Sequence, residues 1–241
     1  MASLNKPRLG TSPETGWMFY SVHLASSYVV KEFLLAGNYR QCLRISEPDP
    51  GEVGPWAKEM RSQDYHELHV HSFIGMWAAF EAGIEDTLAA FVRSDPKAAS
   101  MAVSAIRKAH LYPTEAWPWS DSICLEIAQK IDTVAKNSTP EGGVDLFGRI
   151  RTAFAIIGIQ IPANPQLAAK LAEASRLRNV LVHRNGQVSP KDAEAVPSLG
   201  PWVGSVVPID TDRFRSLYES ISACLVTLVG AIAASDYRPN R

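Results

Sequence analysis

The sequence predicts an all-α protein, built as an antiparallel bundle of amphipathic helices. Apolar side chains recur at three- and four-residue spacing over most of the 241 residues. Residues typical of helix starts and helix ends separate these stretches from one another. No alternation of strands with crossover helices is visible, which argues against a doubly wound sheet.

The N-terminal part is expected to contribute one helix outside the main bundle. Residues 17–37 carry apolar side chains at helical spacing and end on Gly37. A loop rich in proline, glycine and acidic residues follows. We therefore divide the chain into residues 1–58, a helix and loop packed on or preceding the core, and residues 59–241, a helical domain.

The longest expected helix runs from about Trp56 to Ser94, where Asp95-Pro96 ends it. A break is expected near Gln63-Asp64, where Asp64 could cap a second helical segment. A shorter helix follows over residues 96–110, with Pro96 in the position that proline favours at a helix start.

Three helices are expected in the second half of the domain before its last loop. A helix over residues 122–136 would take Asp121 or Ser122 as its N-cap, and residues 144–159 are helical or partly buried. The next helix begins with Asn164 as cap and Pro165 in its first turn, and Gly186 fits the position just after its end.

An irregular stretch over residues 187–209 separates this helix from the last one. A short hairpin is expected near residues 202–209. The final helix then starts with Asp210 or Thr211 as its cap. An irregular loop before the last helix is therefore part of the predicted architecture.

Composition predicts a folded cytoplasmic protein without a general affinity for polyanions. The formal net charge is −1, from 24 basic and 25 acidic residues, so any nucleic-acid site must be a local patch. Cys42, Cys124 and Cys224 lack the spacing of a disulfide framework or a zinc knuckle and are expected to be buried thiols in a reducing compartment. No secretory signal is visible, and the longest apolar run, about 14 residues, is short for a membrane span. We expect no membrane association.

Three histidines close together, His66, His69 and His71, raise the question of a metal site. On a helix, His66 and His69 lie about 60° apart, but His71 lies about 160° from His69. The spacing of a two-histidine zinc helix is also absent, because Val70 stands where the second histidine belongs. We therefore expect helix-surface or interhelical histidines, and neither a metal nor a cofactor.

The sequence RNVLVHRNG, at residues 178–186, places Arg178, Asn179 and His183 at the end of the expected helix from Pro165. Asn179 and His183 are four residues apart and share a helix face, and the long side chain of Arg178 can swing towards it. One explanation is a basic C-terminus, where His183 and Arg184 complement the helix dipole. That explanation accounts less well for Arg178, which lies more than a turn from the end.

The chemistry of these side chains supports a second explanation, metal-free cleavage of RNA. Such cleavage needs a base for the ribose 2′-OH, an acid for the leaving 5′-oxygen and a cation for the phosphorane-like transition state. Histidine suits both proton roles near neutral pH, and arginine holds phosphate with a fixed fork. A two-fold dimer that brings two such helix ends together would double this set.

Glu81 is the acidic residue that we connect with this site. It borders an apolar stripe of the long helix, where it is either solvated or directed into the bundle. A buried carboxylate needs a cationic partner, and Arg178 is the partner we expect.

The motif resembles that of the HEPN superfamily, whose members carry Arg, four to six residues and His near the end of an apolar helix. Arg178, Asn179 and His183 match it with four intervening residues; Arg176 also satisfies the longer spacing but lacks the following Asn. The resemblance extends over residues 65–235, including the helix around Glu81 and the irregular stretch before the last helix.

The resemblance implies a HEPN-type bundle that forms a homodimer with its motifs facing one another. Active members are metal-independent endoribonucleases, many of them in toxin–antitoxin, phage-defence or RNA-processing systems, so RNA and an antitoxin or regulatory protein are the expected partners. In this hypothesis His183 is the base or acid, Arg178 binds the scissile phosphate, Asn179 orients the pair, and Glu81 and Arg184 support them. Other members are non-catalytic dimerisation or interaction modules that bind a nucleotide, RNA or protein, which is the alternative function.

Overall fold

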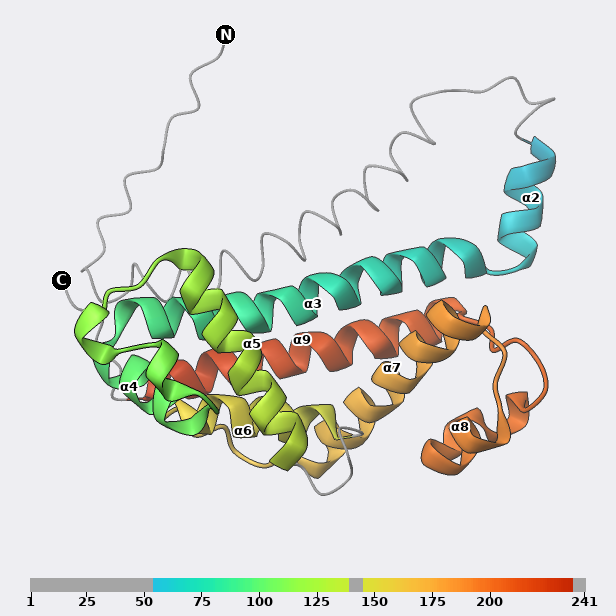
Figure 1. Cartoon of the computed structure of the whole chain (residues 1–241). Helices are drawn as coiled ribbons and strands as arrows, with labels where there is room; N and C mark the ends of the chain where they lie inside the picture. Colours follow the sequence, from blue (N-terminus) through green and yellow to red (C-terminus); the bar gives the residue numbers. More distant parts are fainter. Residues whose placement is uncertain (1–53, 139–144, 236–241) are drawn as a thin grey trace, which may run out of the picture.

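The computed structural model describes residues 54–138 and 145–235, which form a bundle of helices (Figure 1). Its helices are α2 (Gly54–Ser62), α3 (His66–Ser94), α4 (Pro96–Ala105), α5 (Asp121–Ser138), α6 (Leu146–Ile156), α7 (Pro165–Arg184), α8 (Pro190–Ala195) and α9 (Thr211–Ala234). Short 3-10 turns are η1 (Ala109–Leu111), η2 (Thr114–Ala116) and η3 (Pro197–Trp202). No strand occurs within the described ranges, so the all-α prediction is confirmed.

The division of the chain at residue 58 falls inside α2. The helix expected over residues 17–37 and Cys42 lie outside the described residues. Cys124 and Cys224 are free and buried, as expected of structural thiols. Burial raises the pKa of both thiols, that of Cys224 to about 12.

Polar contacts between α3 and α5 show in which direction these helices run. Arg93 near the end of α3 pairs with Asp121 at the start of α5 at 3.0 Å. Gln129 further along α5 donates to Glu85 of α3. These two contacts show that α5 runs antiparallel to α3, and Figure 1 shows α7 running opposite to its neighbour α9.

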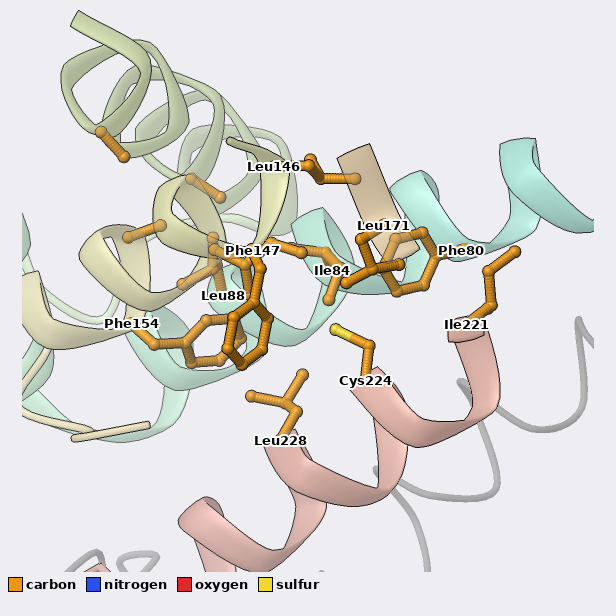
Figure 2. Close-up of a cluster of buried hydrophobic side chains, with 14 of the residues drawn as sticks. Phe80, Ile84, Leu88, Leu146, Phe147, Phe154, Leu171, Ile221, Cys224 and Leu228 are labelled. Carbon is orange, nitrogen blue, oxygen red and sulfur yellow. The ribbon is translucent and has the colours of Figure 1, made fainter. Parts of the chain in front are cut away.

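The core lies where α3, α6, α7 and α9 meet, and Figure 2 shows part of it. Its side chains come from one face of each helix, at spacings of three, four or seven residues where a helix contributes more than one: Phe80, Ile84 and Leu88 of α3, Phe147 and Phe154 of α6, Leu171 of α7, and Ile221, Cys224 and Leu228 of α9. Each large apolar side chain buried in this way contributes about 1.5–3 kcal/mol. These clusters explain why the periodic sequence stretches fold onto one another.

Among the described helices, α9 alone has the length and apolar composition of a membrane span. Its stripe of Ile221, Cys224 and Leu228 is buried against the other helices of the bundle. Only 33% of its most apolar 18-residue window is buried in the bundle, and one helix of this kind is weak evidence for a membrane span.

Two histidines of α3 hold the segment that leads into α9. The Nδ1 atom of His66 accepts a hydrogen bond from the backbone N–H of Ile209 at 2.9 Å. The Nδ1 atom of His69, which is buried, lies 3.0 Å from the carbonyl oxygen of the same Ile209 and is the donor there. The ring of His69 also stacks on Phe214 at 4.9 Å. The ring contact of His69 with Phe214 is therefore interhelical, as expected, whereas the hydrogen bonds of both histidines go to Ile209 in the segment before α9.

Asp64 has a different role from the one expected. The break between α2 and α3 is confirmed, but α3 starts after Tyr65 without a side-chain cap. The Asp64 carboxylate instead accepts the backbone N–H of Thr211 at 2.7 Å and its hydroxyl at 3.0 Å. Asp64 thus stabilises the start of α9, because the first backbone N–H groups of a helix lack intrahelical partners.

Some expected boundaries were wrong. The helix after Pro96 ends at Ala105 rather than residue 110. α5 begins at Asp121, so the capping hydroxyl is that of Ser120, which lies 3.4 Å from the Ile123 nitrogen. No hairpin forms within residues 202–209, because its residues bridge to the chain after α7 instead, at Gln187–Val206 and Val188–Val203.

The histidine contacts predict a pH-dependent stability. Burial is the main cause that lowers the pKa of His66; the charge of His69 lowers it further, and that of Glu67 opposes it. The fold therefore favours neutral His66. The contribution of His66 to the stability of the fold is complete above its unfolded pKa of about 6.5, and it declines as the pH falls below that value. We expect the melting temperature to fall between pH 7 and 5, and to fall less in His66→Gln.

The matched control is His71→Gln, since His71 is an exposed histidine on the same helix. Thermal unfolding of the three proteins at several pH values checks the prediction. If the melting temperature of His66→Gln falls between pH 7 and 5 as much as that of wild type and His71→Gln, His66 is not the cause of the pH dependence.

Candidate functional site

Helix α7 carries the candidate site, and its ends form as the sequence predicts. The side chain of Asn164 accepts the backbone N–H of Leu167, and Pro165 lies in the first turn. At the other end Asn185 and Gly186 both have positive φ, at 50° and 81°, and the Gly186 N–H donates to the carbonyl of Val180. A left-handed backbone at Gly186 is the glycine helix end that the sequence indicates.

The buried stripe of α7 determines where its polar side chains lie. The stripe consists of Leu167, Leu171, Ala174, Leu177, Val180 and Leu181. Arg178 and Asn179 fall between two of these buried positions and are half-buried, whereas Val182, His183 and Arg184 are exposed. The motif therefore begins at the edge of the core and ends in solvent.

The guanidinium of Arg178 turns towards Asn179. Its Nη1 donates to Oδ1 of Asn179 at 3.0 Å, although neighbouring side chains on a helix do not normally face one another. Its Nη2 lies 3.5 Å from Oε2 of Glu81 on α3, so the predicted ion pair is present. The side chains of Arg178 and Glu81 remain 31% and 43% exposed, so this pair is loose and reachable from solvent.

His183 lies one helical turn after Asn179. Because α7 is continuous over this stretch, the two side chains point in directions only about 40° apart. His183 has no hydrogen bond or ion pair with any residue in the described ranges, and its side chain is exposed. Asn179 is therefore the link that brings the Arg178 guanidinium onto the face that His183 shares.

A buried carboxylate, Asp192 of α8, holds the other two arginines of this helix end. Its Oδ1 accepts a hydrogen bond from Nη2 of Arg184 at 2.6 Å. Nε of Arg176 lies 2.7 Å from the same oxygen in an ion pair, without its N–H aimed at it. Oδ2 accepts the backbone N–H and the hydroxyl of Ser189. This cluster ties the end of α7 to α8.

The electrostatics of Asp192 follow from these contacts. Its side chain is fully buried, and burial alone would raise its pKa. The hydrogen bonds from Arg184 and Ser189 outweigh burial, so the pKa of Asp192 lies far below its ordinary value. Asp192 is charged at neutral pH, and its single negative charge, shared by Arg176 and Arg184, offsets one of their two positive charges. Arg178 has no such tight partner.

The sequence motif does not point to Asp192 as a residue of the site, although the sequence carries one signal for its role. Ser189 and Asp192 form a capping box around Pro190 at the start of α8, with the spacing Ser-x-x-Asp. That pattern predicts the bond between Ser189 and Asp192. It carries no information on Arg176 and Arg184, which reach Asp192 only because the chain turns back after Gly186.

Within residues 54–138 and 145–235, no group of three or more His, Cys, Asp or Glu side chains is arranged to hold a metal ion. The chemistry that the described site offers comes from an imidazole, a guanidinium and an amide. Together they can exchange a proton and bind an anion.

The two acidic partners of the α7 arginines should differ in their effect on stability. Asp192→Asn removes a buried charge that accepts several hydrogen bonds, so the free energy of unfolding should fall by about 2–3 kcal/mol. Glu81→Gln removes a partly exposed ion pair and should change it by less than about 1 kcal/mol. Urea unfolding of both variants checks this, and effects of equal size would contradict the assignment of Asp192 as the anchor of this helix end.

No protein-family model matches the chain, and neither the curated proteins nor the solved structures contain a significant match. The function must therefore be argued from the geometry of this site.

Proposed function

We propose that the protein is a metal-independent endoribonuclease of HEPN type that acts as a homodimer, with His183, Arg178 and Asn179 as its catalytic residues. One observation carries the proposal. The Arg178 guanidinium is bound to Asn179, on the helix face that His183 shares, and His183 is exposed to solvent. An anion at this face would meet both a guanidinium and an imidazole.

The arginines of α7 differ in their freedom to bind phosphate. Arg176 and Arg184 share the buried Asp192, so moving either of them would uncover a charged carboxylate. Arg178 has Glu81 at 3.5 Å as its acidic partner and can exchange that contact for a phosphate at little cost. Arg178 is therefore the phosphate-binding residue of the proposal, and Arg184 supports the helix end.

In the proposed reaction the ribose 2′-oxygen attacks the adjacent phosphorus atom, and the bond from phosphorus to the 5′-oxygen breaks. One imidazole takes the proton of the 2′-OH, and an acid delivers a proton to the 5′-oxygen. The products carry a 2′,3′-cyclic phosphate and a 5′-OH. A homodimer with both α7 ends at one site supplies two imidazoles, one for each proton.

The alternative, a non-catalytic dimerisation or interaction module, is less well supported. It expects a buried pair of Arg178 and Glu81 and a His183 that is sealed from solvent. The ion pair is present, but both of its side chains are partly exposed, as is His183. As a ribonuclease the protein would act on cytoplasmic RNA, as a toxin or phage-defence effector, and an antitoxin or regulatory protein would restrain it.

The test is cleavage of total cellular RNA by the purified protein in the presence of EDTA. We expect wild type to cleave, and Arg178→Ala and His183→Ala to lose activity by at least about 100-fold, since each removes a group that acts in the transition state. His71→Ala is the control, because it removes an exposed histidine of α3 outside the site. Melting temperatures close to that of wild type would show that the variants remain folded.

Retained cleavage in His183→Ala, or cleavage by wild type that EDTA abolishes, would contradict the mechanism. Absence of cleavage by wild type would favour the interaction module.

A further inference from the structure

The outward face of α9 is unusual for a surface helix. Its exposed positions alternate by three and four residues, the spacing of a coiled-coil seam. We call Ala223, Val226, Gly230 and Ala233, which are all exposed, the α9 seam. Val226 is 72% exposed, the highest value among the large exposed hydrophobic side chains of the described residues.

A helix face that meets water usually carries polar or charged side chains. The outer face of α5 follows this rule, with Glu126, Gln129 and Lys136 exposed. On α9 the last charged residue is Glu219, and the rest of the helix to Ala234 has no charge. The α9 seam therefore has the composition of a contact surface rather than a solvated one.

We propose that residues 17–37 of the same chain dock on the α9 seam as an additional helix of the bundle. An apolar stripe at helical spacing runs along this segment: Met18, Val22, Ala25, Val29, Phe33 and Ala36. Met18 and Val22 match the small side chains of the seam, because alanine and glycine leave room into which larger apolar side chains fit.

The N-terminal segment is long enough to cover the seam. Residues 17–37 would form a helix of about 32 Å, and the seam spans about 15 Å from Ala223 to Ala233 at 1.5 Å per residue. The described chain starts at Gly54 with α2, which leads to the end of the bundle where Asp64 and His66 contact the start of α9. Residues 38–53 can span at most about 55 Å, which is enough to place Gly37 at that end. The docked segment would then run antiparallel to α9.

A segment of the same chain fits this surface better than a second copy does. One valine, two alanines and one glycine offer far less than the roughly 1,000 Å² that a stable interface between two chains buries. A tethered segment needs less area, because the linker holds it at an effective concentration in the millimolar range. The seam also lies in the second half of α9, away from the α7 motif, so this inference does not depend on the proposed function.

Hydrogen–deuterium exchange on the full chain tests the inference. We expect amides of residues 17–37 to be protected in wild type, and Val226→Asp to speed their exchange at least tenfold without changing α3 and α5. A charge at residue 226 would be buried by docking, which is unfavourable. Leu111→Asp is the matched control, because it places the same charge on another exposed apolar side chain, in η1.

A second measurement avoids a destabilising charge. A nitroxide label on Val226→Cys, in a chain that also carries Cys42→Ser, should broaden the NMR signals of residues 17–37. Unbroadened signals, or fast exchange of these residues in wild type, would overturn the inference.

Protection that disappears on dilution would show that a second copy covers the seam. If wild type instead floats with phosphatidylcholine–phosphatidylglycerol vesicles while Val226→Asp does not, a membrane covers the seam. Either of these two results also overturns the inference that residues 17–37 cover it.

Discussion

The apolar stripe of α7 sets the position of each polar side chain in the candidate site. Leu177, Val180 and Leu181 are buried, so the residues between and after them can lie only at the edge of the core or in solvent. Arg178 is placed at that edge, within reach of α3, and His183 is placed outside. The site is thus a consequence of helical periodicity, in which a half-buried cation and an exposed imidazole are separated by one turn.

Two further anchors keep this helix end in place. Asp192 ties the end of α7 to α8 through Arg184 and Arg176. At the same end of the bundle, His66 and His69 hold the backbone of Ile209, and this fixes α9 against α3. Because α7 packs on both α3 and α9, the contact between Arg178 and Glu81 depends on these anchors. The candidate site is supported by buried or partly buried polar groups that do not belong to the motif.

Much of the helical framework could be predicted from the sequence because its signals are local. Asn164, Pro165 and Gly186 mark the two ends of α7 by the backbone conformations and hydrogen bonds that they favour. The contact between Arg178 and Glu81 was one of two alternatives, since a carboxylate at the border of an apolar stripe is either solvated or paired with a cation. In both cases the physical cause lies within one or two helices.

The remaining features depend on contacts between distant segments. Asp64 looks like the cap of the helix that follows it, but it stabilises α9, and no local signal distinguishes these two uses of one carboxylate. The pairing of Gln187 with Val206 replaces the expected hairpin, because the chain after α7 folds back on the stretch before α9. The contacts of Asp192 with arginines also could not be predicted from local signals, since Arg176 and Arg184 come from another helix.

The chemistry assigned to His183 and Arg178 is tested most directly by the end groups of the RNA fragments that the protein produces. Mass spectrometry of fragments made in the presence of EDTA should show 2′,3′-cyclic phosphate at one end and 5′-OH at the other, since the attacking oxygen belongs to the RNA itself. Fragments with 3′-OH and 5′-phosphate ends would require an attacking water, and they would contradict the account.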